Sequence, residues 1–182
     1  RGIFSNGQTT NLGLDIGVFL TSGAGYIIPG PNNSSNAGVS NGMPGDATLN
    51  TLTTSTTYDA AVLEFDLIPT SDTIRFTYVY GTEEYPASVY PDVFGFFVSG
   101  PNPAGGNYSN YNIGFIPEFE EFISNEGGQT LQYDGFTVVL TGSLDVIGAE
   151  EYHITIGIAD CGDGILDSGV FIGENSIWSD TH

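Results

Sequence analysis

Basic residues are almost missing from this sequence, in which Lys and Arg together number 2 against 22 Asp and Glu. The formal net charge of −20 opposes compaction unless cations or salt offset the repulsion. It also makes nucleic acids and anionic membranes poor partners, because both are negatively charged. We therefore expect a saline, calcium-containing extracellular setting. An acidic halophilic cytoplasm would explain the same charge.

Cysteine and long apolar runs are scarce as well. Cys161 is the single cysteine, so no intramolecular disulfide can stabilise the domain. No apolar run approaches the roughly 18 to 20 residues of a membrane span, which argues against direct membrane insertion. Because the chain opens on Arg1 without a signal peptide, we expect a piece excised from a larger surface protein.

The composition instead favours strands and turns. Aromatic residues reach 13% and glycines number 26, whereas helix-favouring charged residues are few. The length suits one large β domain. We predict a single all-β binding domain over residues 1–182, an antiparallel, jelly-roll-like β-sandwich with long calcium-stabilised loops and at most one short helix.

Hydrophobic patterning places the strands. Period-two alternation over 74–80 indicates a half-buried strand, and the apolar run 93–98 indicates a strand buried on both faces in the middle of a sheet. Residues 1–60 read mostly as loops around one or two strands. The remaining expected elements are strands at 61–67, 112–117, 136–141, 152–158 and 168–172, a long loop over 100–112, and a helical turn within 118–129.

Two acidic segments are candidate calcium sites. In the loop between the last two strands, Asp160, Asp163 and Asp167 alternate with glycines, which let the backbone curl so that several oxygens face one point. Calcium takes six to eight oxygen ligands, whereas softer metals need more than the two histidines present. The spacing is not that of an EF-hand, and a solvated turn explains the loop equally well.

The second segment lies at the end of the 74–80 strand and the start of the 93–98 strand. The adjacent Glu83 and Glu84 would repel each other unless a cation sat nearby, and Asp92 precedes the next strand. If the connecting loop folds back, these carboxylates reach the same sheet edge as the 160–167 loop. A bound cation would then tie the two segments together.

At these residues the chain resembles the choice-of-anchor L domain of bacterial surface proteins. The resemblance implies a module of a large secreted or adhesive protein, and more distantly the layout is similar to calcium-dependent peptide-binding domains of bacterial adhesins. The chain departs from the family pattern at Pro91 and over 45–50, where Asp46 is the one calcium ligand that we expect. The matching segments are TTYDAAVLEFDLIPTSDTIRFTYVYGTEEYP (56–86), DVFGFFVSGP (92–101), YSNYNIGFIP (108–117), QYDGFTVVLT (132–141) and YHITIGIADCGDGILDSGVFI (152–172).

The function predicted from these observations is calcium-dependent binding of an extracellular peptide or glycan by a secreted or surface-exposed adhesin, next to other domains of that protein. The expected Ca²⁺ ligands are Glu83, Glu84, Asp92, Asp160, Asp163, Asp167 and Asp46. The expected ligand-binding residues are Tyr85, Ser88, Tyr90, Asp134 and Ser168.

Two alternatives remain open. A structural spacer or polymer subunit could use calcium only for stiffness. A glycan-cleaving hydrolase needs two facing carboxyl groups, but Glu83 and Glu84 are neighbours on a strand and should point to opposite faces. His153 has no nucleophile pattern beside it, and an acidic loop should raise the pKa of the Cys161 thiol. We therefore expect no enzyme.

Overall fold

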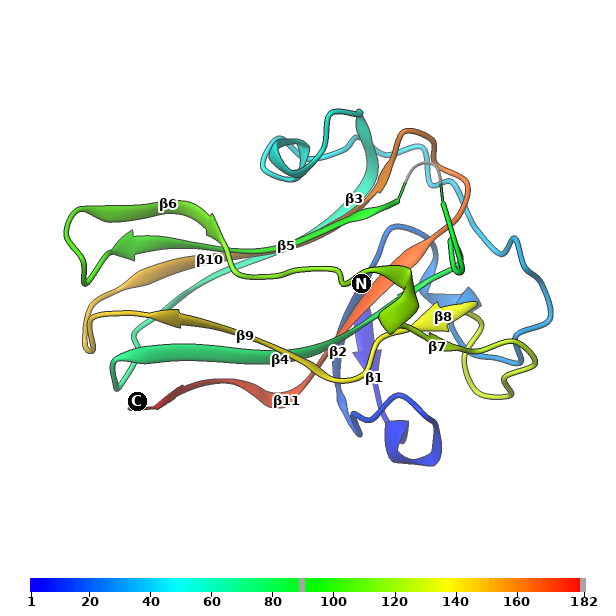
Figure 1. Ribbon diagram of the computed structural model, residues 1–182, viewed down its shortest axis with the longest axis horizontal. Coiled ribbons are helices and arrows are strands. Elements are labelled where there is room, and N and C mark those ends of the chain that lie inside the picture. The colour runs from blue at the N-terminus through cyan, green and yellow to red at the C-terminus, as the bar shows by residue number, and fades with distance from the viewer. Residues whose placement is uncertain (89–90, 181–182) are drawn as a thin grey trace.

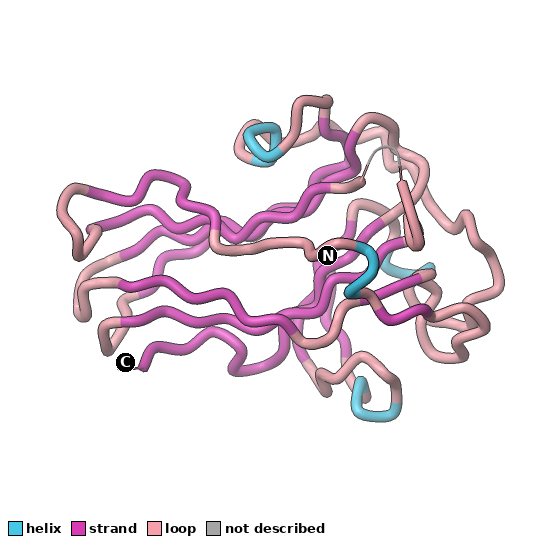
Figure 2. The backbone as a smooth tube through the Cα atoms, in the orientation of Figure 1, coloured by secondary structure: helices cyan, strands magenta, loops and turns pink. Residues whose placement is uncertain are grey.

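The computed structural model describes residues 1–88 and 91–180. Two antiparallel sheets lie face to face with the core between them, and the layers separate clearly in Figures 1 and 2. This confirms the predicted all-β sandwich. Helical structure in the described part is limited to the 3-10 turns η1 (Gly7–Thr9), η2 (Gly25–Ile27), η3 (Leu49–Leu52) and η4 (Phe119–Glu121).

The larger sheet has the strand order β1-β2-β11-β4-β8-β7, with β9 also paired to β4. Because Ser168 at the start of β11 pairs with Thr82 at the end of β4, the acidic segments that follow β4 and precede β11 begin side by side. The strands are β1 Gly2–Phe4, β2 Gly17–Thr21, β4 Thr73–Thr82, β7 Ile123–Ser124, β8 Gly135–Phe136, β9 Leu140–Asp145 and β11 Ser168–Asp180.

The smaller sheet has the order β3-β10-β5-β6. Its register pairs Ala159 with Val93 and Asp160 with Tyr58, so the end of β10 meets the starts of both β5 and β3. The strands are β3 Thr57–Leu67, β5 Val93–Pro101, β6 Asn107–Asn112 and β10 Tyr152–Cys161. Both sheets therefore bring acidic strand ends to the same end of the sandwich.

Aromatic rings from both sheets fill the sandwich interior. Phe76 on β4 stacks on Phe96 on β5 with 3.9 Å between ring centroids, and both side chains are fully buried. Tyr78 donates its hydroxyl to the carbonyl of Phe115 at 2.7 Å, and burial raises its pKa to about 12. Packing of this kind holds the two sheets in a fixed relation and so positions the strand ends.

Some expected strands are confirmed and others differ. Residues 93–98 form a buried central strand as predicted. The expected loop over 100–112 was wrong in its second half, where β6 forms, because an edge strand can pair through its backbone without an apolar alternation. The strand expected over 112–117 is absent. There the Asn112 side chain accepts the Phe96 N–H at 2.9 Å, in place of a ladder carbonyl.

The strand expected over 136–141 is interrupted. The hydroxyl of Thr137 accepts the N–H of Tyr80 at 3.1 Å, a bond that a backbone carbonyl would make in a regular ladder. Pairing with β4 therefore stops after Phe136 and resumes at Leu140 as β9. The turn expected within 118–129 is confirmed as η4.

No helix in the described ranges has the length and apolar character needed to cross a membrane.

Candidate functional site

Five carboxylates are buried where the strand ends of the two sheets meet. Asp160 closes β10 and Asp167 precedes β11, and both are 0% exposed. Glu83 and Glu84 follow β4, and the backbone N–H of Glu83 donates to the carbonyl of Asp167 at 3.0 Å. Asp92 precedes β5 and is 4% exposed. The fold thus gathers the two acidic segments into one buried group, here called the carboxylate cluster.

Part of the cluster is held by hydrogen bonds to nearby backbone. Glu84 is well satisfied, because Oε1 accepts from the Ser88 hydroxyl and Oε2 from the N–H of Asp92, each at 2.7 Å. Asp167 Oδ2 accepts the N–H of Val39 at 2.9 Å. These bonds fix the side chains and tie the chain around Val39 to the cluster.

Other oxygens of the cluster have no hydrogen-bond partner among the described residues. They are Glu83 Oε1, Asp92 Oδ2, both oxygens of Asp160, and Asp167 Oδ1. The Ser22 hydroxyl lies near enough to lower the pKa of Asp160, but its geometry makes no hydrogen bond to either oxygen. Buried polar atoms are nearly always hydrogen-bonded, and burying an ionised carboxylate without a partner costs on the order of several kcal/mol. The cluster therefore requires either protons or cations.

Burial raises the pKa values of the cluster. Desolvation, reinforced by neighbouring carboxylates, raises the pKa of Glu83 to about 8, that of Asp160 to about 7 and that of Asp167 to about 6. The pKa of Asp92 is raised well above its ordinary value by the same causes, with Glu84 and Asp160 as the repelling charges. At neutral pH the cluster therefore favours the binding of protons or cations.

Asp59 on β3 is a sixth buried carboxylate that sequence reasoning missed. Its Oδ2 accepts the N–H of Asn41 at 2.9 Å, and its charge raises the pKa of both Asp160 and Asp167. A Cβ built on Gly164 would lie 3.6 Å from Asp160 Oδ2 and 3.8 Å from Asp59 Oδ2, so the two carboxylates border the same space. Asp59 was overlooked because the expected strand began two residues later, at residue 61. The signal that could have identified it is a single acidic residue at the otherwise uncharged start of the strand.

The other residues predicted from the sequence occupy different surroundings. Asp163 is exposed. Asp134 accepts the side-chain N–H of Asn32 at 2.9 Å, and its charge raises the pKa of Glu83. Ser168 is fully buried, with its hydroxyl on Thr82 at 2.9 Å. Of the predicted ligand-contacting residues, Ser88 donates a hydrogen bond to Glu84, and Tyr85 stacks on Phe122 with ring centroids 6.1 Å apart. Tyr90 lies outside the described residues.

Asp46 has a local structural role. Its Oδ1 accepts the backbone N–H groups of Thr48 and Leu49 at 2.8 and 3.1 Å, where the η3 turn begins. We expect Asp46→Ala to lower the free energy of unfolding by about 1 kcal/mol, the usual net value of such bonds. Any calcium affinity of the domain, measured by calorimetry, should stay within twofold of the parent. A tenfold loss would instead make Asp46 a ligand.

The cluster is not a finished metal site. Within the described ranges, no three Asp, Glu, His or Cys side chains already stand as a metal-ligand set. Asp160 is the common neighbour of the group, because its charge interacts with those of Asp59, Asp167, Glu84 and Asp92. A cation would therefore have to draw side chains from two or more strand ends toward itself.

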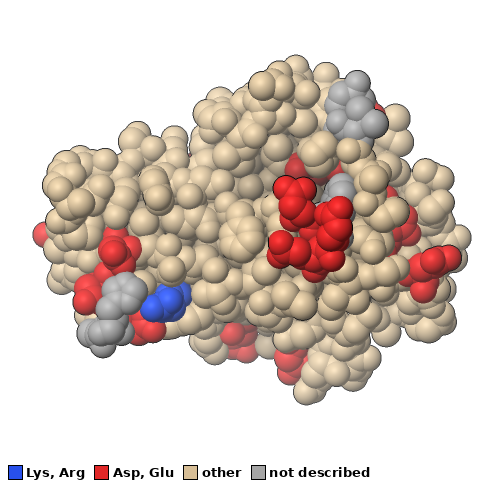
Figure 3. Space-filling model, viewed as in Figure 1, with Lys and Arg blue, Asp and Glu red and all other residues tan. Residues whose placement is uncertain are grey.

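The outer surface shows a separate acidic feature. On the face in Figure 3, carboxylates gather in a patch over η4, away from the single basic spot at the far end of the molecule. Exposed Glu118, Glu120 and Glu121 are the acidic residues of this segment. They are distinct from the buried cluster.

Comparison with known proteins identifies the family. The family model described as "Choice-of-anchor L domain" matches residues 1–127 and 118–178, which together cover nearly the whole chain. No curated protein and no solved structure matches. A match to this family model indicates an extracellular module associated with a bacterial surface or secreted protein. With its acidic strand ends, two-sheet architecture and this match, the chain belongs to the choice-of-anchor L domain family.

Proposed function

We propose that this domain is a calcium-dependent recognition module, which binds an extracellular peptide or glycan beside its acidic strand ends. The observation that carries the proposal is the set of five buried carboxylate oxygens without hydrogen-bond partners in the described part of the chain. Ion binding would supply the missing positive charge, because only 2 Lys and Arg exist in the whole sequence.

The donor set suits a hard divalent cation. Asp160, Asp167, Asp92 and Glu83 offer carboxylate oxygens without hydrogen-bond partners among the described residues, and Asp59 adds a further carboxylate near Asp160 and Asp167. Calcium accepts six to eight such oxygens in flexible geometry, so it tolerates ligands from several strand ends better than magnesium does. Calcium would neutralise the cluster and draw the strand ends together.

Loop contacts link the cluster to the surface. Backbone N–H groups of the 37–43 segment donate to cluster carboxylates, with Ala37 on Glu83 at 3.3 Å and Met43 on Asp59 at 2.5 Å. A cation that changes the charge and position of these carboxylates therefore changes the shape of the loop. This coupling supports calcium control over ligand binding at this end of the sandwich.

The test combines calcium titration with a binding survey. Calorimetry should detect calcium binding with a Kd on the order of 10⁻⁴ to 10⁻³ M, typical of extracellular modules. Asp167→Ala should weaken calcium binding at least tenfold, while the exposed control Glu120→Ala should change it less than twofold. An absence of calcium binding at 10 mM would refute the proposal.

Peptide and glycan arrays probed in calcium and in EDTA then test recognition. We expect hits that disappear in EDTA. Calcium binding without any array hit would favour a spacer, and release of sugar from a glycan over time would favour a hydrolase.

A further inference from the structure

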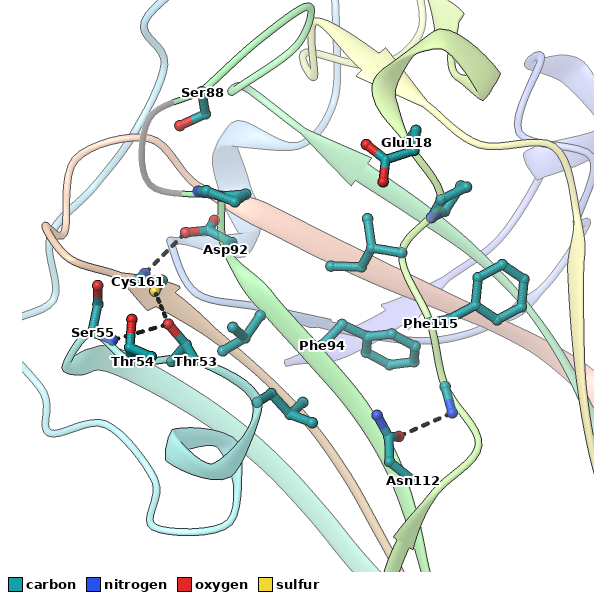
Figure 4. A pocket seen from close by; sticks show the side chains of 16 residues that line it. Thr53, Thr54, Ser55, Ser88, Asp92, Phe94, Asn112, Phe115, Glu118 and Cys161 are labelled. Atoms are coloured by element: carbon teal, nitrogen blue, oxygen red, sulfur yellow. Dashed lines mark hydrogen bonds between the residues drawn. The ribbon is translucent and has the colours of Figure 1, made fainter.

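A cleft of about 740 Å³ runs beside the start of β5, next to the carboxylate cluster. One wall is the chain after η3 at 52–55, and the other is the segment 112–118 that leaves β6 (Figure 4). Asp92 and Phe94 lie along its floor, where Asp92 accepts the N–H of Cys161 at 3.2 Å. The cleft is open to solvent, and its floor is a strand whereas its walls are loop segments.

The floor of the cleft carries strand backbone that pairs with β10 on one side and, among the described residues, has no strand beside it on the other side before Phe97. Phe96 directs its N–H to Asn112 Oδ1 and its carbonyl to the N–H of Ile113, which is the β6 side of the strand. Hydrogen-bonding direction alternates along an antiparallel strand, and the pairing of β5 with β10 runs through Phe94 without a shift. The N–H and carbonyl of Phe94 therefore also face away from β10, into the cleft.

The chain after β6 cannot cover this edge, because it turns toward the opposite sheet. Asn112 Oδ1 also accepts the N–H of Gly114 at 3.0 Å, and Gly114 packs closely against the backbone of Phe96. Phe115 then exchanges two hydrogen bonds with the hydroxyl of Tyr78 on β4, at 2.7 and 3.1 Å. Figure 4 shows this segment opposite the floor strand, with the Phe94 side chain between the two.

The walls present two kinds of side chain. Phe115 is half exposed at 48% and lies near Phe94, which gives the cleft an apolar side. Glu118 lines the cleft, and the exposed Glu120 and Glu121 that follow it in the sequence belong to the acidic patch over η4. Side chains of an extended peptide alternate between two faces. An apolar residue of such a peptide would therefore contact Phe115, and a neighbouring basic residue would contact Glu118.

We propose that the cleft binds an extended peptide with basic side chains, which adds as a strand to the free edge of β5 at Phe94. Backbone bonds to Phe94 would supply affinity, and lysine or arginine contacts to Glu118 and the acidic patch that continues from it would supply selectivity. This inference names the ligand class of the proposed function and rests on its recognition part. Strand addition of the peptide does not require direct contact between calcium and the peptide.

The test uses a defined probe, a fluorescent nonapeptide of alternating Lys and Val with blocked ends. Its control carries N-methyl groups on alternate backbone amides, which block strand addition without changing charge. Anisotropy should show at least tenfold weaker binding of the control. Amide exchange by NMR should show the Phe94 N–H slowed at least tenfold by the parent peptide. Equal binding of both peptides, or binding without protection of Phe94, overturns the proposal.

Variants separate this site from general attraction to an acidic protein. The charge reversal Glu118→Lys, Glu120→Lys, Glu121→Lys should weaken binding of the parent peptide at least tenfold at low salt. Glu174→Lys, an exposed site on β11, should change it less than twofold. Thr54→Trp, which fills the cleft from its exposed wall, should also abolish binding. Similar losses in the Glu174 variant and the triple variant would contradict a specific site.

Running the titration in calcium and in EDTA distinguishes the two proposals. Binding with Phe94 protection in both buffers supports strand addition and removes calcium dependence from the proposed function. Calcium binding by calorimetry without peptide binding in either buffer leaves the metal proposal standing and overturns strand addition.

Discussion

Chelating calcium at pH 8 should lower the melting temperature by about 3 to 6 °C for each ion lost. At tenfold excess over Kd an ion adds about 1.4 kcal/mol, and 1 kcal/mol corresponds to about 2 to 4 °C for a chain of this size. Differential scanning calorimetry in calcium and in EDTA measures the difference. At pH 5 the same chelation should change the melting temperature by less than about 1 °C, because protons then occupy the cluster.

The sign of the pH effect follows from the raised pKa values. Folded pKa values of about 8 for Glu83, 7 for Asp160 and 6 for Asp167 exceed ordinary values of 4.5 and 3.8. Between about pH 4 and pH 8 the native state therefore holds more protons than the unfolded state, and stability without metal falls as pH rises. The full stability is present below the unfolded pKa values and is lost as pH passes the folded ones.

The calcium contribution has the opposite trend. Calcium replaces the protons that the cluster loses, so the difference between calcium and EDTA melts should grow from pH 5 to pH 8. Magnesium at the same concentration serves as the control and should give less than half the shift. Identical melting curves in calcium and EDTA at pH 8 would remove the ion from this account of the cluster.

Asp160→Asn should make the metal-free protein more stable while removing its response to calcium. Both Asp160 oxygens are buried and lack hydrogen-bond partners in the described part of the chain. An amide removes the buried charge and can donate to the neighbouring carboxylates. We expect a gain of about 2 kcal/mol at pH 8, since each pKa unit corresponds to about 1.4 kcal/mol and the shifts are shared among coupled groups.

Two measurements decide this prediction. In EDTA at pH 8 the melting temperature of the variant should rise by about 4 to 8 °C, and calorimetry should detect no calcium binding at 10 mM. The exposed control Glu174→Gln should change either quantity little. Suppose that the variant melts at a lower temperature in EDTA and binds calcium like the parent. The Asp160 charge would then not destabilise the fold, and Asp160 would not be a calcium ligand.

The sequence by itself was sufficient for the fold class and for the central strands. Alternation at 74–80 and the apolar run at 93–98 depend on local patterning, and the structure places both in sheets that form the core. The acidic segments were also visible as local features. What could not be read was their burial, since the turn-forming residues of the 160–167 loop are equally typical of an exposed turn.

Only the tertiary structure decided how the site is built. Asp59 joins the cluster because β3 extends back past the expected start and holds this residue at φ 48°, a conformation in which Asp is tolerated. The free edge at Phe94 exists because the chain after Asn112 bonds Tyr78 on the opposite sheet. Residue type and spacing determine secondary structure locally. Burial, electrostatic coupling and unpaired strand edges depend on which distant segments meet, and that is settled by packing.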